Sequence, residues 1–87
     1  MAEEEIFEFP CRFPVKAIGP DDPDFTDHVI EIVSAHVGEI PPGDVTTRPS
    51  SNGNFVSVTV TFTAESRTQL DNIYQSLTAS EKIQVVF

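Results

Sequence analysis

The sequence predicts one small α+β domain with the element order β-α-β-β-α-β, in which two helices cover one face of an antiparallel sheet. Three observations predict it: a stretch with strand periodicity, two stretches with helical periodicity, and a length of 87 residues that allows a single hydrophobic core. In the clearest strand, the apolar residues Val56, Val58, Val60 and Phe62 alternate with serine and threonine. The helical stretches, residues 21–38 and 63–77, each carry one apolar stripe.

The first half of the chain predicts a strand followed by a helix. Residues 11–19 alternate in polarity, and their apolar face consists of Phe13, Val15 and Ala17. Gly19 and Pro20 are expected to end this strand, because glycine turns easily and proline lacks an amide donor. The acidic stretch 21–24 predicts a helix start, with aspartate as the N-cap and proline in the first turn. Gly38 is expected to end the helix in a left-handed conformation.

The second half predicts two strands, a second helix and a closing strand. Residues 45–48 form a short strand that a six-residue turn joins to the strand from Phe55 onward. The turn residues to which we assign a structural role are Ser50, Ser51 and Gly53, the glycine at positive φ. Ser66 and Gln69 have the spacing of a capping box at the start of the second helix. Residues 83–87 close the chain as the fourth strand.

Two amphipathic helices and four strands with one apolar face each make a two-layer sandwich. Right-handed β-α-β crossovers then place the first and third strands at the centre of the sheet. This is the ferredoxin-like fold. We expect it over residues 10–87, after an acidic lead-in at residues 1–9.

Charge and composition exclude several classes of partner. Fourteen acidic residues against five basic ones give a net charge of −9, which repels nucleic acid and anionic membranes. The start of the chain is acidic where a secretory signal is basic, and no apolar run approaches the ~20 residues that span a bilayer. The single cysteine, Cys11, suits a reducing compartment. We therefore expect a cytoplasmic protein, as a monomer or weak homodimer.

The residues that usually carry catalysis do not form a recognised site. His28 and His36 lie eight residues apart, about 12 Å along a helix, and cannot share a metal. His36 belongs to the apolar stripe, so we interpret it as a histidine at the edge of the core that bonds to backbone, and we expect His28 to be exposed to solvent.

The sequence does not fit the known motifs for a calcium loop, a Cys-x-x-Cys pair or a phosphate-binding loop either. An EF-hand loop counted from Asp22 needs glycine and glutamate where Asp27 and Val33 stand. Cys11 has no Cys-x-x-Cys partner, and the turn at Gly53 lacks the lysine and the helix of a phosphate-binding loop. We therefore expect no enzyme, no cofactor and no metal site.

Two segments, residues 8–16 and 48–59, resemble the YbeD-like family of small bacterial proteins of unknown function, and residues 73–77 also match. The most specific piece is Pro-Ser-Ser-x-Gly-x-aromatic-x-Ser-Val, in which Phe55 stands where the family has tyrosine. The resemblance covers residues 6–87. It implies a ferredoxin-like fold similar to the ACT-type regulatory domain, and it implies no activity.

Three of the five basic residues map to one sheet face. Alternation places Arg12 and Lys16 on the face opposite the core, and Arg48 joins them if the turn pairs it with Phe55. The predicted partner surface consists of Arg12, Lys16, Arg48, Ser57 and Thr59. An exposed strand face favours long basic side chains in any case, because they discourage aggregation. The alternative is that this face meets a small carboxylate or phosphate metabolite, an acidic protein surface, or the acidic helix of a second copy.

Three functions remain open. The first, which we predict, is a non-enzymatic regulatory or adaptor module that binds another protein. The second is an ACT-like domain that senses a small anionic metabolite or an amino acid. The third is a nucleic-acid binder of the RRM type, which needs two or three stacking aromatic residues, whereas only Phe55 is expected on the open face.

Overall fold

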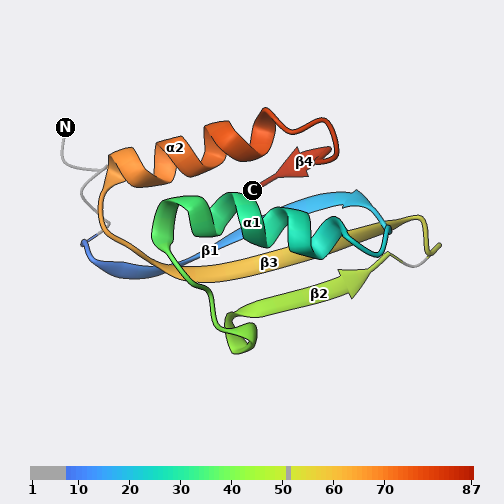
Figure 1. Cartoon of the computed structure of the whole chain (residues 1–87), viewed down its shortest axis with the longest axis horizontal. Coiled ribbons are helices and arrows are strands. Elements are labelled where there is room, and N and C mark those ends of the chain that lie inside the picture. Colours follow the sequence, from blue (N-terminus) through green and yellow to red (C-terminus); the bar gives the residue numbers. More distant parts are fainter. Residues whose placement is uncertain (1–7, 51) are drawn as a thin grey trace.

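The computed structural model describes residues 8–50 and 52–87 and contains the predicted elements in the predicted order (Figure 1). The elements are strand β1 (Cys11–Pro20), helix α1 (Phe25–Val37), the 3₁₀ helix η2 (Pro42–Asp44), strands β2 (Val45–Pro49) and β3 (Phe55–Ala64), helix α2 (Arg67–Thr78) and strand β4 (Val85–Val86). Residues 1–7 of the expected lead-in lie outside the described residues, whereas Phe9 packs against the core.

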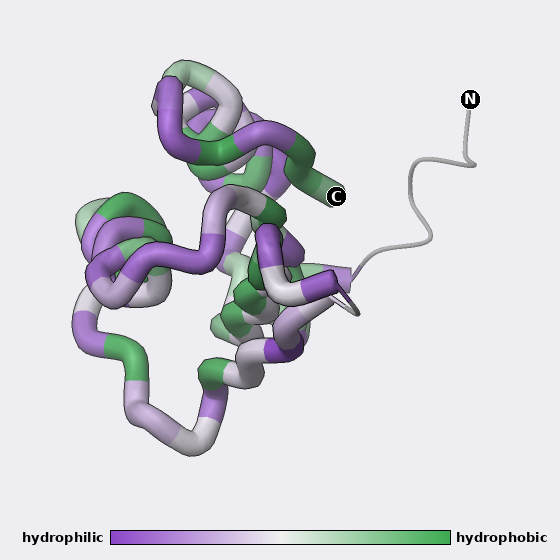
Figure 2. The backbone as a smooth tube through the Cα atoms, turned by 90° about the vertical axis from the view of Figure 1, so that its right-hand side faces the viewer, coloured by the Kyte–Doolittle hydropathy of each residue, from purple (hydrophilic) through white to green (hydrophobic). Residues whose placement is uncertain are grey.

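The four strands form one antiparallel sheet in the order β2-β3-β1-β4. The central strands β1 and β3 pair over ten residues each, from Cys11 opposite Ala64 to Pro20 opposite Phe55. Strand β4 is shorter than predicted, although backbone bonds between Lys16 and Phe87 continue its pairing with β1. Both helices lie on one side of the sheet (Figure 2). The predicted fold class is therefore confirmed.

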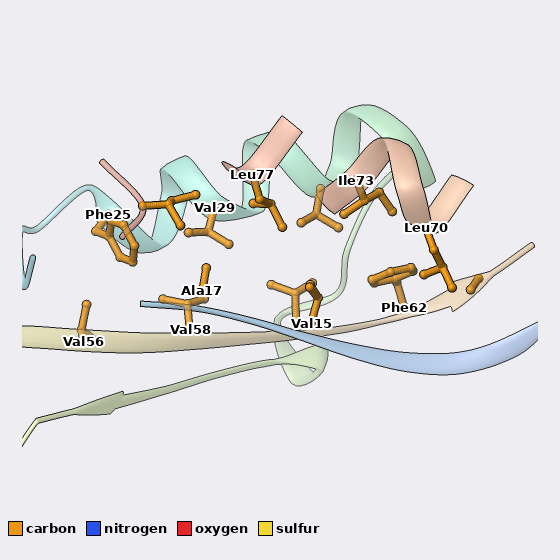
Figure 3. Packing of buried hydrophobic residues seen from close by; sticks show 14 residues of the cluster. Val15, Ala17, Phe25, Val29, Val56, Val58, Phe62, Leu70, Ile73 and Leu77 are labelled. Carbon is orange, nitrogen blue, oxygen red and sulfur yellow. The ribbon is translucent and has the colours of Figure 1, made fainter. Parts of the chain in front are cut away.

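Alternation on the central strands directs their apolar side chains toward the helices (Figure 3). The core that results is closed by both helices and by the loop before β4. The fully buried or nearly buried apolar residues are Val15, Ala17, Phe25, Val29, Val33, Val56, Val58, Val60, Phe62, Ala64, Leu70, Ile73, Leu77 and Ile83. Every residue predicted for the buried face of β3 belongs to this core.

Helix α1 begins later than the acidic stretch suggested. Its N-cap is Asp24, whose side chain makes no capping hydrogen bond, and the amide of Phe25 donates to the carbonyl of Asp22 instead. The N-cap is therefore an aspartate, as predicted, but the expected place of proline in the first turn was wrong, because Pro23 lies in a backbone turn that precedes the helix. Gly38 ends α1 at φ 88°, as predicted, and its amide donates to the carbonyl of Ser34.

Helix α2 begins with the predicted cap and is also tied to α1. The Ser66 hydroxyl accepts a hydrogen bond from the amide of Gln69 at 3.1 Å. The Gln69 side chain accepts from the amide of Glu65 at 2.8 Å and donates to the carbonyl of His36 at 3.2 Å. One side chain therefore satisfies backbone groups at the start of α2 and at the end of α1.

Both histidines of α1 bond to serine side chains of the second half of the chain, His36 to one in α2 and His28 to one just after α2. Nε2 of His28 lies 2.8 Å from the Ser80 hydroxyl, and Nε2 of His36 lies 2.9 Å from the Ser76 hydroxyl. The expectation that His28 is exposed was wrong, since its ring is half-buried against the end of α2. His36 lies at the edge of the core as expected, but its ring bonds to a serine side chain rather than to backbone.

Gly19 has a different role from the one expected. It does not end β1, which continues to Pro20, and it is buried. A Cβ atom at this position would lie 2.6 Å from the carbonyl oxygen of Lys82 and still closer to the ring of Phe25. Gly19 is therefore the point where α1 and the loop before β4 approach the sheet closely.

Replacing Gly19 with alanine should destabilise the protein by about 1–3 kcal/mol, because the new methyl group overpacks a site closed by backbone. Gly43→Ala is the matched control, since a Cβ at Gly43 meets no atom within 4 Å. Urea unfolding of both variants measures the difference. Equal midpoints would show that the Phe25 ring and the neighbouring backbone move aside at no cost.

The direction in which β3 faces can be tested by a pair of neighbouring substitutions. Val60 is fully buried, so Val60→Ala should cost about 2–4 kcal/mol in lost apolar transfer and a residual cavity. Thr61 points to the opposite face, and Thr61→Ala should cost under about 0.5 kcal/mol. Thermal or urea unfolding gives both values, and a larger loss for Thr61→Ala would contradict the assignment of the faces.

Candidate functional site

The open face of the sheet, on the side away from the helices, is built from two neighbouring rows of side chains. The pairing of the strands defines both rows, because residues opposite one another in a sheet direct their side chains to the same face. The first row runs Thr46, Thr59, Lys16 and Phe87. The second row runs Arg48, Ser57, Ile18 and Val85. Each row thus contains one cation, at least one hydroxyl and at least one apolar side chain at the β4 side.

Lys16 and Arg48 share a shallow hollow, the central hollow, of about 240 Å³. Its remaining lining consists of the hydroxyl-bearing residues Thr46, Ser57 and Thr59. Within the part of the chain that the structure describes, neither cation makes an ion pair. The Ser57 hydroxyl donates to the carbonyl of Arg48 at 3.3 Å, and this bond ties the edge strand β2 to β3. Two cations and three hydroxyl groups around one hollow favour an anionic group.

Arg12, the third predicted cation, is separated from the other two. It lies four residues before Lys16 on β1, roughly 13 Å along an extended strand. Nη2 of Arg12 lies 2.9 Å from Oδ1 of Asp44, and its Nη1 donates to the Thr63 hydroxyl at 3.3 Å. Arg12 therefore lines a different hollow, of about 220 Å³, where an acidic side chain already compensates its charge. Of the five predicted surface residues, the structure brings together the other four.

The turn before β3 determines the face on which Arg48 lies. Arg48 pairs with Ser57 rather than with Phe55, so the assumed register was wrong by two residues. A shift of two residues leaves the side-chain direction unchanged, because the period of a strand is two. Arg48 therefore lies on the open face by a pairing different from the one assumed.

Ser50 and Gly53 hold this turn together. The Ser50 amide donates to the carbonyl of Phe55 at 2.8 Å, and the Ser50 hydroxyl accepts from the Phe55 amide at 3.1 Å. The amide of Gly53 donates to the carbonyl of Ser50, and Gly53 has φ 79°, as predicted. Ser51, to which a role was also assigned, lies outside the described residues.

The open face also carries exposed apolar side chains, most of which sequence reasoning missed. Among the described residues, the large hydrophobic side chains with the greatest exposure are Phe55 at 36%, Val85 at 43% and Phe87 at 59%. All three lie on the open face by strand pairing, and Nζ of Lys16 lies 5.7 Å from the centre of the Phe87 ring. The expectation that Phe55 is the only aromatic residue there was wrong, because the position of Phe87 depends on pairing with β1.

Two apolar depressions flank the central hollow. One, of about 420 Å³, is lined by Pro14, Lys16, Thr59 and Phe87. The other, of about 190 Å³, is lined by Ile18, Arg48, Pro49, Ser50, Phe55, Val56 and Ser57. Each depression shares one cation and one hydroxyl-bearing residue with the central hollow. The open face therefore offers an apolar, a cationic and a second apolar subsite side by side.

The charges of the protein are segregated by layer. The strands, within the bounds that the structure gives, contain no aspartate or glutamate, whereas the helices and loops carry the acidic residues of the described chain. A positive patch thus lies within a molecule of net charge −9. Such a patch directs a complementary anion to one place on the surface.

Metal-ligating clusters, membrane-spanning helices and shifted pKa values would indicate other kinds of function in the described residues. Within residues 8–50 and 52–87, no three side chains of histidine, cysteine, aspartate or glutamate gather to hold a metal ion. No helix of this part of the chain is long and apolar enough to cross a membrane. Burial raises the pKa of the Tyr74 hydroxyl above its usual range, and this residue lies on α2, in the helical layer.

The fold and the site together define a class: a small ferredoxin-like domain with one face of the sheet covered by helices and the other bare. The chain belongs to the family described as "Protein of unknown function (DUF493)", whose model matches residues 4–87. This membership confirms the resemblance to YbeD-like proteins of unknown function.

Relatives match over nearly the whole chain. A "UPF0250 protein" of Chromobacterium violaceum is 46% identical over 84 residues, which cover 97% of this chain and 94% of the relative. One from Paraburkholderia phytofirmans is 45% identical over 83 residues, which cover 95% of this chain and 93% of the relative. The solution structure of protein HP0495 from H. pylori has a TM-score of 0.72 at 15% identity and covers 100% of this chain and 93% of that one. This last likeness concerns the fold alone.

The turn that positions Arg48 and Phe55 can be tested at Gly53. Gly53→Val should destabilise the protein by more than about 1 kcal/mol, because a β-branched residue is strained at positive φ. Gly53→Asn should cost less, since asparagine tolerates this conformation and a Cβ here meets no atom within 4 Å. Chemical denaturation compares the two variants. Equal losses would show that the conformation of the turn is not what requires glycine.

Proposed function

We propose that this protein is a non-enzymatic regulatory or adaptor module that binds another protein through the open face of its sheet. One observation carries the proposal. Phe55, Val85 and Phe87, the most exposed large hydrophobic side chains of the described residues, share one face of the sheet with Lys16 and Arg48. Lys16 and Arg48 are the cations of this face that make no ion pair within the described residues.

The composition of this face suits a protein interface. Aromatic residues and arginine are enriched in such interfaces, where they supply large contact areas and hydrogen bonds at little entropic cost. Arg48 and Phe55 provide these groups on the neighbouring strands β2 and β3, and Phe87 provides one just after β4, opposite Lys16 of β1. Lysine and hydroxyl groups between them keep the unbound face hydrated. The cations orient an acidic partner and raise its rate of association.

A second candidate is an ACT-like domain that senses a small anionic metabolite or an amino acid. The observation in its favour is the central hollow, where Lys16, Arg48 and three hydroxyl groups surround one space. The open shape of this region favours the protein partner instead. The central hollow of about 240 Å³ and the depressions beside it, of about 420 and 190 Å³, lie open on a sheet face, whereas small-molecule sites bury most of the ligand's surface.

Reversal of the two unpaired cations tests the proposal. The double variant Lys16→Glu/Arg48→Glu should retain its fold and lose at least about tenfold in partner binding, because both charges become repulsive to an acidic surface. Affinity capture and crosslinking from a bacterial extract, followed by purification of the captured partner, give its affinity for each variant. Arg12 is left unchanged because its reversal would break the ion pair with Asp44.

The matched control carries the same change of net charge elsewhere. Arg67→Glu/Lys82→Glu reverses two exposed cations, one in helix α2 and one in the loop before β4. It also removes the ion pair of Arg67 with Asp71, at 3.8 Å, but both side chains are exposed to solvent and such a pair contributes little to stability. This variant should retain the partner. Equal loss in both double variants would show a general effect of net charge, and retention in both would show that the open face is not the binding surface.

A further inference from the structure

We infer that the open face binds an extended acidic segment of its partner, in which one aspartate or glutamate lies between two apolar side chains. The inference rests on the proposed docking role of this face and adds the chemistry of the segment that it recognises. Three features of the described residues support it: the unpaired cations, the flanking apolar depressions and the spacing between them.

The carboxylate is assigned to the central hollow. Lys16 and Arg48 approach it from β1 and β2, and hydroxyl groups of Ser57 and Thr59 lie between them on β3. A guanidinium, an ammonium and neighbouring hydroxyls together satisfy several lone pairs of one carboxylate. Among the described residues, the open-face cation that has an ion pair is Arg12, with Asp44, and no ion pair involves Lys16 or Arg48. The charge of the hollow therefore remains available to a partner.

The apolar positions are assigned to the two depressions beside this hollow. The larger one presents the Phe87 ring and Pro14, and the smaller one presents Ile18 and Phe55. Because Phe87 is 59% exposed, a partner side chain that covers it removes apolar surface from water. Each depression shares with the central hollow the residues that lie between them. The three subsites are therefore adjacent, with no gap for a further side chain.

The spacing of the subsites fits an extended chain. On β3, the smaller depression is lined by Phe55 and Ser57 and the central hollow by Ser57 and Thr59, a step of two residues or roughly 7 Å. The larger depression shares Thr59 with the central hollow and extends from there across β1 to Phe87. Side chains at alternate positions of an extended peptide have the same repeat. An apolar, an acidic and an apolar residue at alternate positions would therefore reach all three subsites together.

A second copy that stacks its own open face on this one is the less favourable occupant. Two open faces stacked on one another would bring Lys16 and Arg48 of one copy toward the same cations of the other. Like charges at a desolvated interface oppose association. An acidic segment has the charge complementary to this face, and we therefore assign an acidic segment of the partner as its occupant.

The test uses a capped peptide of the form acetyl-Ser-Leu-Ser-Glu-Ser-Phe-Ser-amide, titrated into the full-length ¹⁵N-labelled protein. At peptide concentrations up to about 1 mM, amide shifts should concentrate on the open-face residues of β1, β2 and β3. Replacing the peptide's glutamate by glutamine, or both apolar residues by serine, should weaken binding at least about tenfold. Rising salt should weaken the glutamate peptide and leave the glutamine peptide nearly unchanged.

Two protein variants locate the interaction. Arg48→Gln should weaken binding of the glutamate peptide and leave the glutamine peptide unaffected, whereas Lys82→Gln, outside the open face, should change neither. Circular dichroism and the unperturbed regions of the spectrum confirm that both variants are folded. Arg48→Gln that binds both peptides like the parent would overturn the inference.

The remaining outcomes also decide the question. The inference is overturned if no peptide produces shifts, if shifts fall outside the open face, or if free glutamate at equal concentration reproduces them. Shifts that grow with protein concentration alone would assign the face to a second copy and overturn it as well. If the captured partner depends on Lys16 and Arg48 while the peptides do not bind, the docking role stands and only the linear acidic segment is wrong.

Discussion

The pairing of β1 with β3 is the constraint on which both faces of this protein depend. Ten consecutive residue pairs fix which side chains of the two central strands point toward the helices. Val15, Val58 and Val60 become fully buried in this register, and Lys16 and Thr59 become neighbours on the opposite face. A slip by one residue would place lysine and threonine beneath the helices and expose the valines. The hydrophobic core therefore determines the arrangement of the open face.

Patterns local in the sequence were enough to predict the architecture. The period of two from Val56 to Phe62 and the two helical stripes specify elements with one apolar face each, which favour a sheet covered by helices on one side. What the sequence could not reveal depends on contacts between distant segments. His28 meets Ser80 across 52 residues of sequence, so no local pattern predicts its burial. The close approach at Gly19 likewise depends on Phe25 and on the backbone of Lys82.

The candidate site shows the same division. Arg48 was predicted on the correct face in spite of a wrong register, because the error was an even number of residues and strand parity is insensitive to it. Apart from Phe55, the apolar part of the site was missed, since the place of Phe87 follows from backbone bonds to Lys16 that the sequence does not specify. Arg12 has the same parity as Lys16, but the η2 turn brings Asp44 beside it and separates it from the other two cations. Parity predicts the face of a residue, and only tertiary contacts decide its neighbours.

The segregation of charge explains how a bare sheet face can remain both hydrated and selective. A face of valine and phenylalanine alone would bind any apolar surface, including its own copy. In this protein each open-face row places a cation and a hydroxyl beside its apolar residues, so a partner must desolvate Lys16 or Arg48 in order to cover Phe87 or Phe55. Burying an unpaired cation is costly, and only a partner that supplies an anion offsets that cost. Under the proposed docking role, these cations therefore favour a partner that carries an acidic group next to an apolar one.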